Sequence, residues 1–140
     1  MMRVLVVDDD EVARELLSRE LTQAGYEVLS VPSPIGVTRV IQEQTIDVVV
    51  IDVVMPSLRG DSLAKLLRKN PRFAKLVVIL VSGESEGELE RLASAAGADA
   101  VVSKRWVPGT LAGTVAAAVR ARTKVAEAPR SAASPNSRKS

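Results

Sequence analysis

The chain has 140 residues, with 19 basic and 17 acidic side chains, and it contains neither cysteine nor histidine. This length favours one domain with its own core. The missing residue types exclude disulfides, zinc sites built on thiolate or imidazole, and histidine acid–base chemistry. No apolar stretch approaches the roughly 20 residues of a membrane span, and no signal peptide opens the chain. We therefore expect a soluble cytoplasmic protein without membrane contacts.

The excess of positive charge belongs to the C-terminal residues. Residues 124–140 hold four basic residues and one acidic residue, so residues 1–123 carry 15 basic against 16 acidic side chains. We therefore expect no direct nucleic-acid binding from this chain. Residues 124–140 are also rich in Ser, Ala and Pro. They predict a disordered tail, or a linker to an output domain, after a domain at residues 1–123.

Five apolar runs rich in β-branched residues predict the strands of a sheet. Each run is nearly continuous, which is typical of strands that are buried on both faces of a parallel sheet. The predicted strands cover residues 3–8, 26–31, 47–52, 76–82 and 100–103.

The first two helices are predicted from apolar spacing and start signals. A helix at residues 10–24 ends before Gly25, which suits the position after a C-cap. The second helix is expected to begin at Ser33 as N-cap, with Pro34 at its first helical position. The apolar face predicted for the first helix consists of Val12, Leu16, Leu17 and Leu21.

Three further helices complete the pattern. One follows Gly60, one opens with a capping-box spelling from Ser85 to Glu88, and the last runs over about residues 108–122, starting at Pro108. Strands that alternate with helices at this spacing imply right-handed crossovers. The fold class is therefore α/β, with a doubly wound parallel sheet.

Acidic residues stand at the ends of two predicted strands. Asp8, Asp9 and Asp10 end the first strand, and Asp52 ends the third. The reactive site of such a sheet lies outside the carboxyl ends of its strands, so these acids should converge. Carboxylates this close repel one another unless a cation sits between them, and oxygen ligands suit Mg²⁺. Acids at a helix start also act as caps, and for Asp10 we expect a role at the positive end of the first helix.

A hydroxyl and an amine complete the arrangement. Ser82 ends the fourth strand, and Lys104 follows the fifth. Taken singly, each has an ordinary alternative, a turn serine or a solvated lysine. An acid pair, a lone aspartate, a hydroxyl and a lysine, each at its own strand end, together resemble the receiver domain of two-component response regulators, the CheY-like superfamily.

Two motifs strengthen the resemblance, which covers roughly residues 3–122. It implies a flavodoxin-like (βα)5 three-layer sandwich with strand order 2-1-3-4-5. The motifs are Asp52-x-x-Met55-Pro56-x-x-x-Gly60 and Gly97-Ala98-Asp99.

The resemblance assigns a role to each acid. Asp52 would be the phosphoacceptor, receiving a phosphoryl group from a phosphohistidine on a histidine kinase or phosphotransfer protein. Asp8, Asp9 and Asp52, with the backbone carbonyl of Val54, would hold Mg²⁺, for which Mn²⁺ can substitute. The domain would then catalyse its own phosphorylation and dephosphorylation and would not be a conventional enzyme.

The remaining polar groups would bind the phosphate. Lys104 would place its positive charge beside one phosphate oxygen, and the Ser82 hydroxyl would donate a hydrogen bond to another. The added dianion would draw Ser82 and its loop inward and bias a protein-interaction surface near the fourth and fifth helices. A downstream protein or a missing C-terminal output domain would read that surface, and we expect a monomer or a weak homodimer.

Several positions depart from the family pattern or flank the site. Val101 stands where the family usually has Tyr or Phe, and Arg105 replaces the usual proline after the lysine. Trp106, the only tryptophan, is expected either to pack against the start of the fifth helix or to lie exposed beside Arg105 as a partner anchor. Val54 and Glu84, two residues beyond Asp52 and Ser82, flank the path of water to the phosphate.

Three functions remain open on the sequence. The first is a phosphorylatable receiver. The second is a receiver-like protein-interaction module that works without phosphorylation, which Val101 and Arg105 make possible. The third is a metal-dependent phosphatase or small-molecule phosphotransferase using Asp52, although Val54 stands where such an enzyme needs a general acid.

Overall fold

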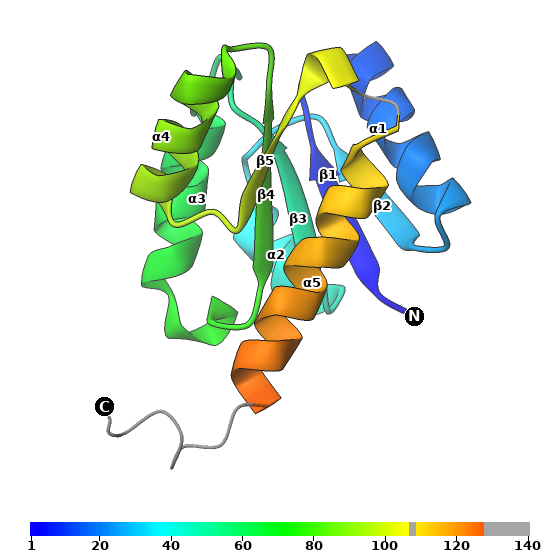
Figure 1. The fold of residues 1–140 in the computed structure, drawn as a ribbon, viewed down its shortest axis with the longest axis vertical. Coiled ribbons are helices and arrows are strands. Elements are labelled where there is room, and N and C mark those ends of the chain that lie inside the picture. The colour runs from blue at the N-terminus through cyan, green and yellow to red at the C-terminus, as the bar shows by residue number, and fades with distance from the viewer. Residues whose placement is uncertain (107–108, 128–140) are drawn as a thin grey trace.

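The computed structural model describes residues 1–106 and 109–127, whose strands form one parallel sheet (Figure 1). The strands are β1 (Arg3–Val7), β2 (Glu27–Val31), β3 (Val48–Asp52), β4 (Val77–Ser82) and β5 (Ala100–Ser103). Their order is β2-β1-β3-β4-β5. The expected doubly wound sheet and its strand order are thus confirmed.

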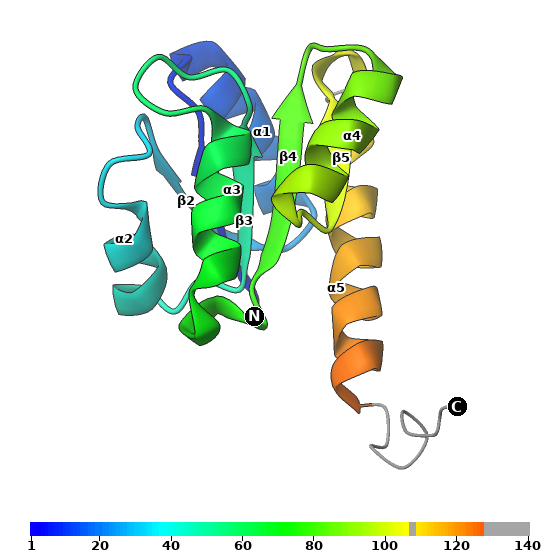
Figure 2. The ribbon, with the colours of Figure 1, turned by 90° about the vertical axis from the view of Figure 1, so that its left-hand side faces the viewer.

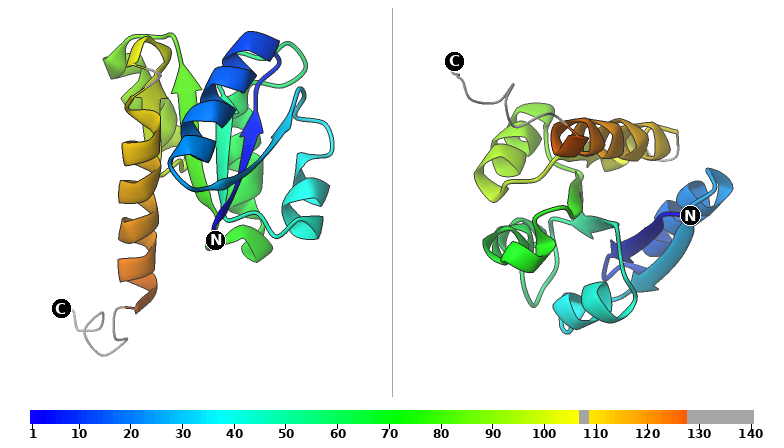
Figure 3. Two further views of the ribbon diagram at one scale, coloured as in Figure 1. Left: turned by 90° about the vertical axis from the view of Figure 1, so that its right-hand side faces the viewer. Right: turned by 90° about the horizontal axis from the view of Figure 1, so that it is seen from below.

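Helices cover both faces of this sheet. The α-helices are α1 (Glu11–Gln23), α2 (Val37–Glu43), α3 (Gly60–Lys69), α4 (Glu86–Ala96) and α5 (Leu111–Glu127). Two short 3₁₀ turns precede β4 and α5, namely η1 (Pro71–Phe73) and η2 (Lys104–Trp106). Figures 1 and 2 show α1 and α5 on one face and α2, α3 and α4 on the other, and Figure 3 shows the layers from two further sides.

Burial on both faces explains the continuous apolar strands. All residues of β3 and β4 are buried, as is β1 after Arg3. On one face the strands pack against Leu17 of α1 and Leu111 of α5, and on the other against Ile41 of α2 and Leu63 of α3. Each apolar side chain removed from water in this way contributes roughly 1.5–3 kcal/mol.

The apolar face of α1 is narrower than the sequence predicted. Leu17 and Leu21 are buried, but Val12 and Leu16 are 66% and 42% exposed. At about 100° per residue, Val12 and Leu16 lie roughly 140° and 100° around the helix from Leu17. Only the stripe through Leu17 and Leu21 therefore faces the sheet.

The predicted start of α2 at Ser33 and Pro34 is wrong. These residues form a turn in which the Ser33 hydroxyl accepts a hydrogen bond from the Ile35 backbone N–H at 3.1 Å. The helix begins at Val37, after Gly36 as N-cap. Gly36 has a φ of 78°, and this left-handed conformation interrupts any helix that starts earlier.

The last two helices differ from prediction at their starts and ends. Ser85 is the N-cap of α4, but its side chain makes no capping hydrogen bond, so the expected capping box is absent. Helix α5 continues past residue 122 to Glu127, so residues 124–127, which the sequence placed in the tail, are helical. Residues 128–140 and the predicted start at Pro108 lie outside the described residues. Within the described ranges, no helix combines the length and apolarity needed to cross a membrane.

Candidate functional site

Four adjacent strands bring the predicted residues to one edge of the sheet. Asp8 follows β1, Asp52 ends β3, Ser82 ends β4 and Lys104 follows β5. Because the strands are parallel, these positions share the carboxyl edge, which is the upper edge in Figure 2. All four residues therefore lie at the ends of strands that the sequence predicted, on one edge of the sheet.

Three carboxylates form a cluster at this edge. Asp8, Asp9 and Asp52 each offer an oxygen, and these atoms lie within 4.8 Å of one another. Asp8 is fully buried and Asp52 is 3% exposed. Asp8 Oδ1 accepts a hydrogen bond from the Asp10 backbone N–H at 2.9 Å, while the buried Oδ2 has no hydrogen-bond partner among the described residues. A buried carboxylate oxygen of this kind is costly unless a cation is near it.

The Lys104 ammonium lies beside the cluster. Its Nζ is 3.3 Å from Asp52 Oδ1 and 3.5 Å from Asp8 Oδ2. Burial, and then the charge of Asp8, raise the pKa of Asp52 above its ordinary value, and Lys104 offsets part of this rise. Burial lowers the pKa of Lys104, but the two carboxylates outweigh it and the pKa is raised overall. Lys104 is therefore a fixed positive charge at neutral pH.

Asp9 and Asp10 have different surroundings. The Asp10 side chain accepts a hydrogen bond from the Ala13 backbone N–H at 2.9 Å, which makes it the N-cap of α1. The expected helix-start role of Asp10 is thus confirmed. The Asp9 carboxylate is exposed and has no hydrogen-bond or ion-pair partner within the described part of the chain. Helix capping therefore does not account for Asp9.

Ser82 and Glu84 shape the loop after β4. The buried Ser82 hydroxyl accepts a hydrogen bond from the Glu84 backbone N–H at 3.2 Å. Glu84 Oε1 lies 3.8 Å from Arg59 Nη2, and Arg59 Nε lies 3.0 Å from Asp61 Oδ1. Arg59 thus connects the loop after β3 with the loop after β4. The sequence analysis missed Arg59, because an ion pair between distant loops leaves no local pattern.

At the end of the loop after β3, the backbone of Gly60 lies close to the backbone of Asp52. The Gly60 backbone N–H donates a hydrogen bond to the Val53 carbonyl at 2.8 Å. A Cβ on Gly60 would lie 2.1 Å from the Asp52 carbonyl oxygen and 2.8 Å from Ile51 Cγ2. The glycine of the motif is therefore required by close backbone approach. Val54, in the same loop, is 59% exposed.

The residues that depart from the family pattern, and Trp106 next to them, lie in β5 and η2. Val101 is half-buried and lines a pocket of about 230 Å³ with Leu89 of α4 and Thr114 of α5. Arg105 is exposed, and its backbone N–H donates to the Ser103 hydroxyl at 3.2 Å. The backbone of Trp106 lies in η2, but the predicted anchor role concerns a side chain outside the described part of the structure.

Asp99, from the second motif, lies at the opposite edge of the sheet. Its carboxylate accepts hydrogen bonds from Arg68, at 2.5 Å, and Arg122, at 2.7 Å, and from the Val78 backbone N–H at 2.8 Å. Arg68 also donates to the Leu76 carbonyl at 2.7 Å. This network joins α3, β4 and α5, so Asp99 has a structural role.

Comparison with known families agrees with this geometry. The sequence profile of the response regulator receiver domain matches residues 4–116. The chain belongs to this receiver domain family. Receiver domains are signalling modules of two-component systems, and in this one the acidic cluster occupies the carboxyl edge of the sheet.

Longer regulatory proteins contain domains similar to this receiver domain. The transcriptional regulatory protein GltR of Pseudomonas aeruginosa is 30% identical over 117 residues, which cover 84% of this chain and 48% of that protein. The sensory/regulatory protein RpfC of Xanthomonas campestris is 35% identical over 119 residues, or 82% of this chain and 16% of that protein. The chain therefore spans half or less of these relatives.

Solved receiver structures match over most of their length. The Vibrio cholerae chemotaxis protein CheY4 has a TM-score of 0.77 and 29% identity, covering 84% of this chain and 98% of that one. TrrA of Thermotoga maritima, solved with Mg²⁺ and BeF, has a TM-score of 0.72 and 30% identity over 84% of this chain and 99% of that one. The flavodoxin-like fold of the receiver domain is thus shown by comparison as well as by topology.

Proposed function

We propose that this receiver domain is a phosphoacceptor, in which Asp52 takes a phosphoryl group from a phosphohistidine on a partner protein. The observation that carries the proposal is that the Asp52 carboxylate lies close both to two other carboxylates and to an ammonium group. Its carboxylate lies with those of Asp8 and Asp9 within 4.8 Å, and Lys104 Nζ is 3.3 Å away. Phosphoryl transfer requires mainly this kind of positioning and charge neutralisation.

The carboxylates suit a divalent cation. They form a compact all-oxygen ligand set, and the buried Asp8 Oδ2 has only the Lys104 ammonium, 3.5 Å away, as a partner among the described residues. We infer that Asp8, Asp9 and Asp52, with the carbonyl of Val54, hold Mg²⁺. When bound there, Mg²⁺ neutralises charge on the oxygens of the transferred group.

The chain's own groups then carry out the transfer. A carboxylate oxygen of Asp52 attacks phosphorus, and the P–N bond breaks with its electron pair leaving on the imidazole, which gains a proton from water. Lys104 balances charge on one phosphate oxygen and the Ser82 hydroxyl donates to another. The Ser82 hydroxyl accepts from the Glu84 backbone N–H and keeps its own hydrogen for this donation. The loop after β4 is therefore coupled to phosphorylation.

The partners follow from this chemistry. A histidine kinase or phosphotransfer protein is the donor, and the reader is a downstream protein or an output domain in the same polypeptide. The names of GltR and RpfC describe transcriptional and sensory regulation in those proteins. We extend to this chain only the receiver step that such regulators share.

Intact-mass spectrometry tests the proposal directly. Incubation with Mg²⁺ and acetyl phosphate or phosphoramidate should add one phosphoryl group. The adduct should disappear in Asp52→Asn or when Mg²⁺ is chelated. Asp10→Asn is the matched control, because it changes a neighbouring acid and keeps a good N-cap. An adduct that persists in Asp52→Asn overturns the assignment.

A second function is favoured by one observation. Val101 stands where the family pattern has an aromatic residue, and it lines a pocket of about 230 Å³ between α4 and α5. This suits a receiver-like interaction module that works without phosphorylation. Failure of wild-type protein to take up any phosphoryl group, with Mg²⁺ present, would favour this module.

A further inference from the structure

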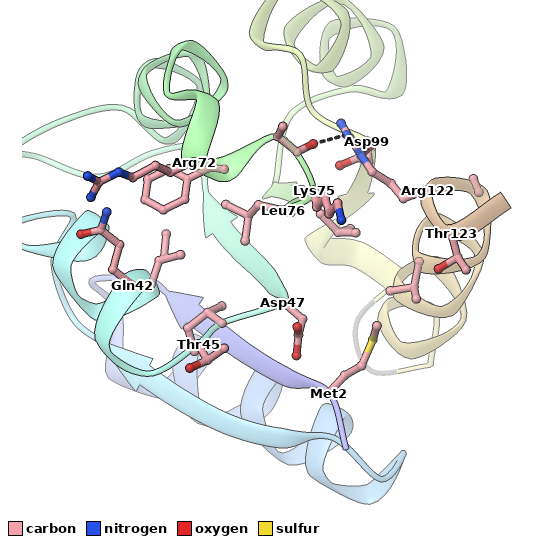
Figure 4. Close-up of a pocket in the computed structure, with 17 residues that line it drawn as sticks. Met2, Gln42, Thr45, Asp47, Arg72, Lys75, Leu76, Asp99, Arg122 and Thr123 are labelled. Carbon is pink, nitrogen blue, oxygen red and sulfur yellow. Dashed lines mark hydrogen bonds and ion pairs between the residues drawn. The ribbon is translucent and has the colours of Figure 1, made fainter. Parts of the chain in front are cut away.

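A large open pocket lies at the amino edge of the sheet, opposite the acidic cluster (Figure 4). Its volume is about 1160 Å³. Apolar side chains from several elements line it, among them Ile41 of α2, Leu76 before β4 and Val119 of α5. Polar side chains surround these, and Figure 4 shows Asp47, Arg72 and Thr123 on different sides. An apolar floor within a polar rim is the usual anatomy of a protein interface.

The acids of this pocket are already satisfied. Asp47 Oδ2 accepts a hydrogen bond from the Arg3 backbone N–H at 2.9 Å. Asp99 is held by Arg68 and Arg122, as described above. Asp99 is thus compensated by two guanidinium groups, whereas Asp47 keeps its negative charge.

Two basic residues at the rim, unlike the acids, have side chains without a partner in the described part of the chain. Arg72 and Lys75 are exposed, and within the described residues their side chains have no hydrogen-bond or ion-pair partner. Arg72, Lys75 and Arg122 line the pocket against Asp47 and Asp99, so its net charge is positive. Carboxylates that approach its rim gain a favourable interaction, and further cations do not.

We propose that this pocket docks a segment of a partner protein in which large apolar side chains are flanked by carboxylates. The pocket exceeds the roughly 300–1,000 Å³ of small-ligand sites, so several side chains fill it better than one small molecule does. Residues 128–140 of this chain are a poor occupant, because they carry three basic residues and no acidic one. The charge at the rim favours an acidic partner segment.

Amide spectra of the full 140-residue chain test the proposal with a defined probe. The probe is a synthetic amphipathic peptide with leucine at i, i+3, i+4 and i+7 spacing and glutamate elsewhere. We expect shifts at residues 41–47, 72–77 and 119–123. A peptide with lysine in place of glutamate should bind roughly threefold to tenfold more weakly.

Charge reversal at the rim supplies the matched comparison. Arg72→Glu combined with Lys75→Glu should reverse the preference, so that the lysine peptide binds more tightly than the glutamate peptide. Lys65→Glu, an exposed change on α3 outside the pocket, should keep the original preference. No shifts, shifts confined to other surfaces, or equal binding of both peptides would overturn the proposal. Concentration-dependent shifts at the pocket without peptide would also overturn it, because a second copy would then be the occupant.

Discussion

Asp9 and Asp10 are neighbours with identical side chains, yet the structure gives them different surroundings. Asp10 caps α1 through the Ala13 backbone N–H, whereas Asp9 lies with Asp8 and Asp52 in the carboxylate cluster. The capping role of Asp10 and the metal role proposed for Asp9 are therefore separable by mutation. The effect of each acid on Mg²⁺ affinity can be measured in the unphosphorylated protein.

We expect Asp9→Ala to weaken Mg²⁺ binding by about tenfold or more, because a site with few protein ligands loses one. Lys104→Ala should not weaken it, since the ammonium occupies space beside the same oxygens and opposes a second cation. Calorimetric titration with MgCl₂ measures both affinities. Unchanged affinity in Asp9→Ala would contradict the metal role of this acid.

Asp52 should lower the stability of the metal-free protein at neutral pH. Its pKa is raised by burial and then by the charge of Asp8, so the folded state binds this proton more tightly than the unfolded state does. The ionised carboxylate therefore destabilises the fold at pH 7. This cost disappears as the pH falls through the raised pKa, where the folded-state carboxyl becomes neutral.

Accordingly, Asp52→Asn should raise the free energy of unfolding at pH 7 by about 1 kcal/mol, the ordinary scale of a point substitution. The difference from wild type should shrink as the pH falls toward 4, close to 3.8, the ordinary pKa of a free aspartate. Urea unfolding across this pH range, without metal, measures it. A lower stability of Asp52→Asn at pH 7 would mean that contact with Lys104 outweighs burial.

At the scale of elements, the loop from β3 to α3 depends on one glycine. A Cβ at Gly60 would approach the Asp52 carbonyl oxygen to 2.1 Å, whereas a Cβ at Gly113, within α5, meets nothing within 4 Å. Gly60→Ala should lower the free energy of unfolding by roughly 1–3 kcal/mol through overpacking, and should slow phosphorylation by displacing Asp52. Gly113→Ala should raise the free energy of unfolding by about 0.5–1 kcal/mol.

Thermal and urea unfolding of the two glycine variants give the comparison. The same substitution is made in each, so intrinsic residue preference alone cannot produce opposite signs. A stable Gly60→Ala variant with normal phosphorylation would show that the loop relaxes, and that the close approach does not position Asp52.

Elements were predictable where a local pattern fixed them. The strands followed from their apolar runs, because burial on both faces removes the alternation of an exposed strand. The start of α2 did not, because Ser33 and Pro34 satisfy the rules of a helix start while Gly36 adopts a left-handed conformation. The prediction of the apolar face of α1 was wrong in part. Helical spacing alone does not show which of two stripes of apolar side chains packs against the sheet.

At the scale of the whole molecule, the site was predictable because topology brings strand ends together. The positions of Asp8, Asp52, Ser82 and Lys104 needed only the order of strands and the direction of the chain. Long-range contacts needed more. Glu20 of α1 accepts hydrogen bonds from backbone N–H groups of Gly109 and Ala112 at 2.9 and 2.8 Å, and no local pattern indicates that a residue so distant in sequence caps α5.

A response of the whole domain to phosphorylation needs a path from the phosphorylated site to α4. The hydrogen bond between the Ser82 hydroxyl and the Glu84 backbone N–H links the end of β4 to the loop before α4. Val101 has no ring whose rotation reports the site. We therefore expect the signal to run through the loop and the start of α4.

Amide spectra recorded with Mg²⁺, with and without beryllofluoride, should change around residues 82–88. The Asp52→Asn variant, treated identically, should show no such change, because it lacks the carboxylate that beryllofluoride needs. The Arg59–Glu84 ion pair spans the loops after β3 and β4, so Arg59→Ala should enlarge the response of residues 82–88 if that pair restrains the loop. Spectral changes at Asp52 with none at residues 82–88 would separate phosphate chemistry from output, and would favour the module that works without phosphorylation.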